Sequence, residues 1–404
     1  MKNPISKMCF VLFVLINQNA FSQAVEKNSA DINANYKRSS LYTLMITNAA
    51  RDYENDIKTV FLEKVVPDKY NNHNLDNRCI VDGGQRNELD NIVNYLNENK
   101  VANQLVAKWF NRSAKGGFNM QLIKERGFYD ATIMDVTKAK SSVRGMAMIA
   151  DAGQELIDNT FILVNDSKYT NKEEVAAVTK SIFSGIMQAA GGSYATQLIG
   201  SSAIETMGKG FVVATHAHLF KLVWDEETQN RFYTELWADD KTITPEKKAA
   251  FDNADFFKLD YIGTDKSWAD VQSTSMTTKT NAELISRATV KSIDNVITKL
   301  QANYDVFKTK TPLYSAEPLC AKIGMKEGVT KKTKFEVLEQ QMNEEDGSIK
   351  FVRVGIVKVD TKRPIWDNRY AAAEDNPYQS DDKTYFKPLK GKEFYAGLLL
   401  RQIK

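Results

Sequence analysis

The chain has few of the residues that mark specialised protein classes. Its 404 residues include only 3 Cys, 3 His, 8 Pro and 20 Gly. This scarcity excludes collagen-like and disordered chains and leaves little room for flexible linkers. Lys and Arg (54) nearly balance Asp and Glu (51), so net charge does not mark the chain as a nucleic-acid binder. The 43% apolar content is that of a globular protein with a sizeable core.

Linear motifs for catalysis are also absent from the sequence. The glycine pairs at 83–84, 116–117 and 191–192 belong to neither a Walker loop nor a dinucleotide-binding fingerprint, which favours ordinary turns. Residues 343–347 lack the alternating ligands of a calcium loop and favour a hairpin turn. No nucleophile-elbow or Cys-His signature occurs. The sequence therefore predicts no catalytic residue, no cofactor and no metal site.

The first 22 residues have the order of a secretory signal. Lys2 and Lys7 precede the apolar run Met8–Ile16, which is about half as long as a membrane span. Small residues at Ala20 and Ser22 predict cleavage before Gln23, and hence a periplasmic or secreted protein without a stable transmembrane span. An uncleaved anchor is the alternative. Residues 23–38 are polar without a period, so we expect an exposed lead-in.

Two cysteines, Cys79 and Cys320, remain after this cleavage. In a compartment that permits disulfides they could pair and tie the N-terminal region to the C-terminal one. Two buried free thiols are the equally favoured alternative.

Residues 39–310 mix helical and strand patterns, which predicts an α+β body, with 39–140 and 141–310 as two possible subdomains. Thr280 and Glu283 form a capping box before the clearest amphipathic helix. Strands are expected at 40–46, 160–164, 211–224, 231–237 and 256–262, the third and fourth forming a hairpin, and helices at 50–64, 89–96, 101–109 and 146–157.

An uncharged segment at 182–204 is long enough for a membrane span but is diluted by Ser, Gln, Thr and Gly. Its small residues favour a buried, glycine-broken helix pair. Insertion into a bilayer after a conformational change is the alternative.

His216 and His218 form the only closely spaced histidine pair. Residues two apart in a strand share one face, as metal ligands often do. Two ligands are too few for zinc, however, and His73 is distant in sequence. We therefore expect two hydrogen-bonded structural histidines on a largely apolar strand.

From residue 317 to 404, short β-rich runs alternate with Gly turns, which predicts a small antiparallel β-barrel. Gly324 and Gly355 are expected where a side chain would clash or φ would be positive.

Part of this region resembles a known module. Residues 320–359 are similar to the C-terminal SH3-like barrel of the flagellar assembly protein T and related bacterial envelope proteins. The matching runs are Ala321–Gly324, Gly328–Val329, Phe335–Val337 and Val354–Val359, while Lys332–Thr333 stands where that pattern has a glycine. The resemblance implies a binding or assembly module and transfers no catalytic residue.

Together these features predict an exported cell-envelope binding or assembly protein without catalytic activity, whose partner is an envelope protein or polymer. One alternative is a hydrolase of envelope polymers, whose carboxylates meet only in the fold. The other is a membrane-active protein that uses residues 182–204.

Overall fold

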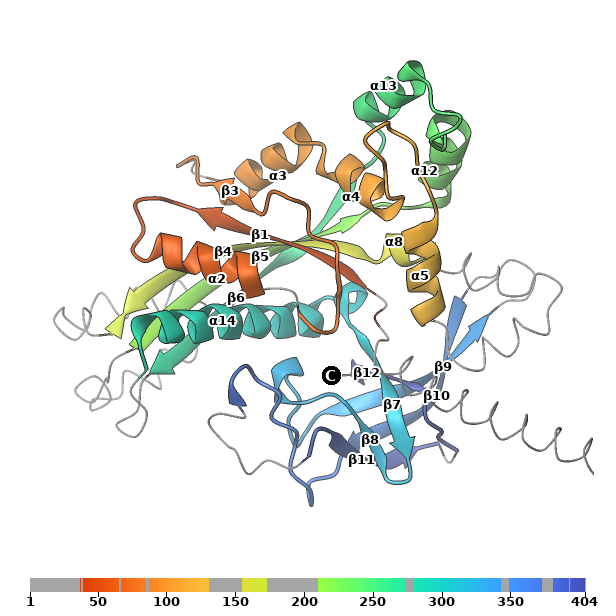
Figure 1. Ribbon diagram of the computed structural model, residues 1–404. Helices are drawn as coiled ribbons and strands as arrows, with labels where there is room; N and C mark the ends of the chain where they lie inside the picture. The colour runs from red at the N-terminus through yellow and green to blue at the C-terminus, as the bar shows by residue number, and fades with distance from the viewer. Residues whose placement is uncertain are drawn as a thin grey trace, which may run out of the picture.

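The structure is a computed structural model (Figure 1). It describes residues 37, 39–64, 67–84, 87–130, 155–172, 210–272, 279–342, 349–372, 381–391 and 393–403. The expected signal peptide, nearly all of the lead-in and the segment 182–204 lie outside these ranges.

A six-stranded mixed sheet forms the centre of the body. Its order is β2-β1-β4-β5-β6, and β3 also pairs with β1. Strands β1 to β4 run parallel, whereas β5 and β6 are antiparallel to their neighbours. The strands are β1 (Ser40–Thr47), β2 (Asn71–Asn72), β3 (Cys79–Val81), β4 (Thr160–Asn171), β5 (Gly210–Leu222) and β6 (Leu259–Gln272). Because β1 pairs with β4, residues 39–140 and 141–310 contribute to one sheet.

Alternate residues of the strands face two different cores. In β1, Leu41 and Met45 pack in the core shared with α2 and α14, whereas Tyr42 and Leu44 pack in the core shared with α3 and α4. Figure 1 shows these helix pairs on opposite sides of the sheet. The helices are α2 (Glu54–Lys64), α3 (Glu88–Glu98), α4 (Val101–Trp109), α5 (Gln121–Asp130), α8 (Glu155–Asp158) and α14 (Asn281–Asn303). The α+β class is confirmed.

The capping box that begins α14 is also confirmed. The backbone N–H of Glu283 donates to Thr280 Oγ1 at 3.3 Å, and the Thr280 N–H donates to Glu283 Oε2 at 2.7 Å. These two bonds satisfy donors that the first helical turn leaves without intrahelical partners.

The expected strand at 231–237 is wrong. This segment is helical, with α12 (Glu226–Arg231) followed by the π-helix η1 (Phe232–Leu236) and, farther on, α13 (Pro245–Asn253). Asp225 begins α12 as its N-cap by accepting the Thr228 N–H at 2.9 Å. The aromatic residues that suggested a strand are instead buried against other rings. The centres of the Phe232 and Phe110 rings lie 4.6 Å apart.

The outer edge of β6 is covered by side chains of α14. Carbonyl oxygens of three alternate residues accept from α14 or from Tyr304, the residue that follows it: Thr264 from Tyr304 Oη (3.2 Å), Lys266 from Lys299 Nζ (2.6 Å) and Trp268 from Asn295 Nδ2 (2.9 Å). Two residues of a strand span about 6.7 Å. Four or five residues of a helix rise about 6 to 7.5 Å, so the spacing of the donors along the helix matches that of the carbonyl oxygens along β6. The edge is therefore protected from pairing with another strand.

Removing this cover should expose the edge. The double substitution Asn295→Ala and Lys299→Ala leaves two edge carbonyls without their helical donors, so we expect destabilisation of about 1 to 2 kcal/mol and greater self-association than in the unaltered chain. Sedimentation velocity across a concentration series measures the association. Asn281→Ala, at an exposed position of the same helix, is the control. Identical sedimentation of all three chains would contradict edge protection by α14.

Six antiparallel strands close into a barrel in the order β10-β11-β8-β7-β12-β9. They are β7 (Lys310–Ala316), β8 (Leu319–Ala321), β9 (Lys334–Met342), β10 (Ile349–Val359), β11 (Thr384–Lys390) and β12 (Leu399–Ile403). Since β7 pairs with both β8 and β12, the barrel begins at Lys310, earlier than the expected residue 317. The 3₁₀ turn η2 (Asp305–Phe307) connects α14 to β7, and a second turn, η3 (Met325–Glu327), follows β8.

Cys79 and Cys320 are both free thiols. Cys79 is half-buried in β3 of the sheet, whereas Cys320 is buried in β8 of the barrel. Of the two alternatives for this pair, the structure therefore contains the free thiols.

Candidate functional site

The two histidines of β5 lie on the same face of the sheet, as expected. His218 is buried, and its Nε2 lies 2.8 Å from Glu88 Oε1 at the start of α3. Its Nδ1 lies 2.7 Å from Thr264 Oγ1 on β6. The hydrogen bond to His218 lowers the pKa of Glu88, despite partial burial of that carboxyl group. His218 thus joins α3 to β5 and β6 through hydrogen bonds.

His73 is far from this pair. It is buried beside α4, where its Nε2 lies 3.0 Å from the carbonyl oxygen of Leu105. Burial lowers the pKa of His73 well below its ordinary value. Within the described ranges, no three His, Cys, Asp or Glu residues form a group that could hold a metal ion.

Several other charged residues lie in exposed turns or pair locally. Lys331 and Lys332 are exposed in the turn before β9. Asp382 pairs with Lys322 and Lys383. Asp239 accepts hydrogen bonds from Thr242, which closes the loop after η1. The expected turn at 343–347 lies outside the described residues, but Met342 of β9 pairs with Ile349 of β10 on either side of it.

A polar cavity of about 280 Å³ lies where the sheet body meets the barrel. We call it the seam cavity. The body supplies residues at the amino end of β1, before β2, at the end of α8 and at the end of β5. The connector (residues 304–309, between α14 and β7), the start of β7 and β12 supply the rest. Its lining residues are Ser39, Lys69, Asp158, Asn159, Lys221, Asp305, Val306, Lys308, Thr309, Lys310 and Arg401.

The seam cavity has an excess of positive charge. Its lining includes four lysines and one arginine but only two carboxylates. Lys221 Nζ lies 2.8 Å from both carboxylate oxygens of Asp158, and Lys308 Nζ lies 2.6 Å from Asp305 Oδ1. These pairs neutralise two lysines, and the other three cations of the lining are Lys69, Lys310 and Arg401.

The three remaining cations also have partners outside the cavity lining. Lys69 Nζ donates to the carbonyl oxygen of Lys322 at 2.6 Å, and Arg401 is paired with Glu336. Lys310 Nζ lies 4.2 Å from the centre of the Phe351 ring. Burial lowers the pKa of Lys69 although Glu327 and Asp68 favour its charged form. Five cations and two carboxylates line the cavity, and Glu336 offsets part of this excess through Arg401.

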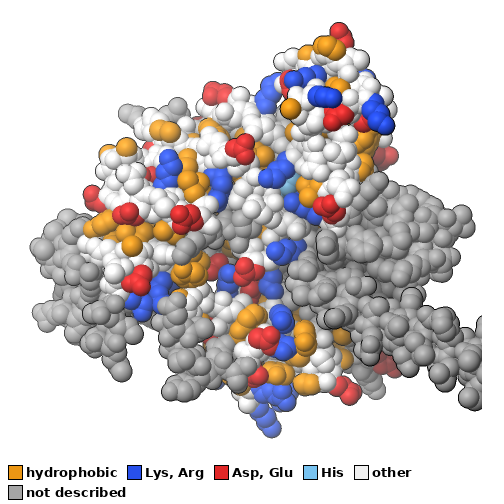
Figure 2. Space-filling view, viewed as in Figure 1, with side chains coloured by type: hydrophobic (Ala, Val, Ile, Leu, Met, Phe, Trp, Pro, Cys, Tyr) orange, Lys and Arg blue, Asp and Glu red, His pale blue; other side chains and the backbone are white. Residues whose placement is uncertain are grey.

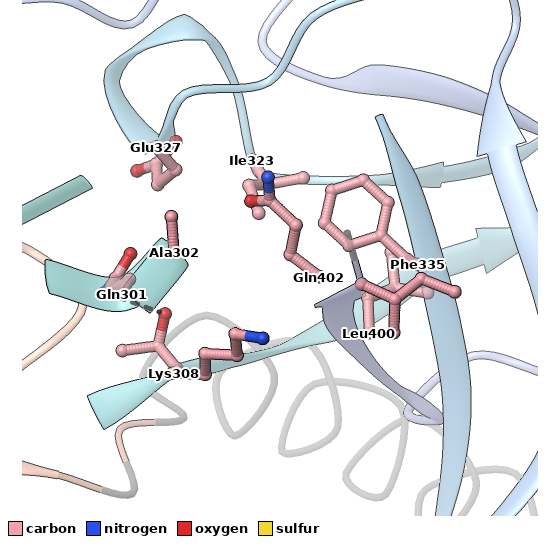
Figure 3. A pocket seen from close by; sticks show the side chains of 10 residues that line it. Gln301, Ala302, Lys308, Ile323, Glu327, Phe335, Leu400 and Gln402 are labelled. Atoms are coloured by element: carbon pink, nitrogen blue, oxygen red, sulfur yellow. Dashed lines mark hydrogen bonds between the residues drawn. The ribbon is translucent and has the colours of Figure 1, made fainter. Parts of the chain in front are cut away.

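A smaller cavity of about 50 Å³ adjoins the seam cavity and shares Lys308 and Thr309 with it. Figure 3 shows Gln301 and Ala302 of α14 on one side of this space and Phe335 and Leu400 of the barrel on the other. Its volume is close to that of one or two water molecules. The larger, cationic space is therefore the better candidate for a ligand site.

Direct contacts hold the barrel against the body around these cavities. Lys326 Nζ of η3 lies 2.9 Å from Asp68 Oδ2, and the Thr298 hydroxyl of α14 donates to the carbonyl oxygen of Lys326 at 3.1 Å. A Cβ on Gly328 would lie 2.4 Å from Thr298 Cγ2, so glycine permits this close approach, and it also suits the left-handed backbone there (φ +74°). Figure 2 shows lysine, arginine and acidic side chains together along the junction.

No residue of the seam cavity was singled out by sequence reasoning. Its cations are spread along the sequence from Lys69 to Arg401. The net charge of the chain, which is near zero, therefore gives no sign that they lie together. The only local signal is the Lys308-Thr309-Lys310 sequence directly after the amphipathic helix.

Comparisons with known proteins provide no family assignment. No protein-family model matches the chain, and no curated protein matches it. None of the helices that the structure describes is both long enough and apolar enough to cross a membrane.

Proposed function

We propose that this protein is an exported binding or assembly protein of the cell envelope, and that its seam cavity binds an anionic group of its partner. The observation that carries the proposal is the excess of cations in a cavity of about 280 Å³. Its volume is near the lower end of the range typical of small-ligand pockets. A cavity with excess charge of one sign favours ligands of the opposite sign.

The position of the cavity fits a binding role. Its walls come from the body, the connector and the barrel, so a bound ligand would contact all three. The similarity of residues 320–359 to SH3-like binding modules of envelope proteins supports the same role, as does the signal-like leader.

The hydrolase alternative has less support from the cavity chemistry. A glycosidase needs one protonated carboxyl group beside the scissile bond. Asp158 and Asp305 line the seam cavity, but each is paired with a lysine. Asp294, whose pKa burial raises to about 7, is absent from the linings of both described cavities. The residues of the membrane-active alternative, 182–204, lie outside the described ranges.

Anion binding at the seam should stabilise the folded protein. A ligand at about 100 times its dissociation constant contributes about 2.7 kcal/mol, which raises the melting temperature by about 3 °C or more. We expect this shift with a mixture of phosphate and citrate, measured against sodium chloride at the same ionic strength. Lys221→Met should reduce it, because this substitution removes a cavity cation.

Lys331→Met is the matched control because Lys331 is an exposed lysine of the barrel outside the cavity. It should retain the full anion-dependent shift. Equal shifts in both variants, or no shift beyond that of sodium chloride, would refute anion binding at the seam cavity.

A further inference from the structure

The chemistry of the seam cavity narrows the class of anion, on the condition that the proposed function holds. Four of its five cations are lysines, which are compact point charges with rotatable donors. The single arginine, whose planar fork suits a carboxylate or a phosphate, is already paired with Glu336. Several ammonium groups around one space suit an anion whose oxygens point in several directions, as those of phosphate do.

Charge and volume agree with this assignment. A lining in which cations outnumber carboxylates is better matched by a phosphate dianion than by a single carboxylate. The hydroxyl groups of Ser39 and Thr309 and the amide of Asn159 provide neutral polar groups in the same lining. A volume of about 280 Å³ corresponds to roughly nine water molecules, which leaves room for an organic group on the phosphate.

The two sides of the cavity carry charge of the same sign. The body contributes Lys69 and Lys221 against Asp158, whereas the connector and barrel contribute Lys308, Lys310 and Arg401 against Asp305. Like charges on the two sides oppose closure of the junction. An anion between them attracts both sides at once.

We infer that the seam cavity binds a phosphate group, free or as a phosphomonoester, and that this group fastens the barrel and its connector to the sheet body. The connector is accessible at Val306, which is 54% exposed between α14 and β7. Phosphate binding should therefore order the connector as well as stabilise the fold.

Calorimetric titration of the full mature chain tests the ligand class. The probes are inorganic phosphate, glycerol 1-phosphate and citrate, each at one fixed ionic strength, together with acetate. We expect both phosphate compounds to bind at least tenfold more tightly than citrate or acetate. Tighter binding of glycerol 1-phosphate identifies a phosphomonoester, and tighter binding of inorganic phosphate identifies the free ion.

Limited trypsin digestion tests the fastening. Lys308 and Lys310 are tryptic sites within the connector and the start of β7, and mass spectrometry reports cleavage at each. Phosphate should slow cleavage there at least fivefold in the unaltered chain. Lys221→Met keeps both tryptic sites but removes a cation of the body, so phosphate should no longer protect it. Lys331→Met should be protected like the unaltered chain.

The outcomes separate the two proposals. If no probe binds, the proposed function and this inference both fail. If citrate or acetate binds as tightly as phosphate, anion binding stands and the phosphate assignment is overturned. If phosphate binds but cleavage at Lys308 and Lys310 is not slowed, the fastening role is overturned.

Discussion

Replacing Gly355 with valine should unfold the barrel while the sheet body remains folded. A Cβ at Gly355 would lie 2.5 Å from Phe394 Cε1 and 2.6 Å from the carbonyl oxygen of Lys390. The phenylalanine ring can move, but the carbonyl belongs to the backbone of the barrel. The pairing of β10 with β9 shifts register between Arg353 and Gly355, so the close approach occurs at a β-bulge.

Valine adds two further methyl groups at this position. Overpacking of this kind costs about 1 to 3 kcal/mol and sometimes more. A backbone clash places Gly355→Val at the upper end of that range, which is a large part of the stability of a small domain. Gly355→Ala should give a smaller effect of the same sign. Lys358→Val places the same residue at an exposed position of the same strand and should be nearly neutral.

Fluorine NMR of protein labelled with 5-fluorotryptophan distinguishes the two parts of the molecule. Trp366 is the only one of the five tryptophans that follows residue 310. In Gly355→Val, its resonance should move to the unfolded position while the other four stay in place. A native Trp366 resonance and an unchanged melting temperature would show that the barrel accommodates a side chain at residue 355.

The elements that the sequence predicted best are those with a regular buried face. The strand β1, the helices α3 and α4, and the capped helix α14 all show such a pattern, and the structure contains each. For these elements the local preference and the final burial agree. The same holds for Gly324, where a Cβ would lie 2.3 Å from the carbonyl oxygen of Trp366.

The predictions are wrong where the burial of a side chain does not determine the conformation of its backbone. Aromatic residues after Asp225 predicted a strand, but the N-cap bond of Asp225 begins a helix and the rings pack around Phe110. Strand β7 lies before residue 317, where the barrel was expected to begin, and it contains Pro312, which is uncommon inside a sheet. Strand β7 pairs with β12, which is distant in sequence, and a local sequence pattern does not reveal such a partner.

The seam cavity was beyond prediction for a related reason. Lys69, Lys221 and Arg401 belong to a loop, a sheet strand and a barrel strand, and only the packing of barrel on body brings them to one space. Each lysine alone has the sequence context of a solvated surface residue. A candidate site built from such residues leaves no linear signature.

The junction between body and barrel should lose stability as the pH rises through neutrality. Asp294 of α14 is half-buried there, and Lys326, Glu327 and Asp68 are the charged groups that act on it. Burial raises the pKa of Asp294 to about 7, and the attraction of Lys326 only partly offsets this effect. Glu327 and Asp68 repel the ionised carboxylate and add to the increase.

The sign follows from proton binding. The folded protein binds the Asp294 proton more tightly than the unfolded chain, whose aspartate has a pKa near 3.8. The stabilisation is therefore complete below about pH 4 and is lost as the pH rises through about 7. At about 1.4 kcal/mol per pKa unit, the loss is at most about 4 kcal/mol, and solvent access to the carboxyl group reduces it.

Asp294→Asn should abolish this pH dependence, because asparagine resembles the protonated carboxyl group. Urea unfolding at pH 5 should give free energies that differ by less than about 1 kcal/mol between the variant and the unaltered chain, whereas at pH 8.5 the variant should be more stable by about 2 kcal/mol. Asp68→Asn is the control: its carboxylate is 79% exposed and pairs with Lys326, so its removal should cost under about 1 kcal/mol at both pH values. If the difference in the free energy of unfolding between Asp294→Asn and the unaltered chain is the same at pH 5 and pH 8.5, Asp294 does not titrate between these values. Burial would then not raise its pKa as proposed.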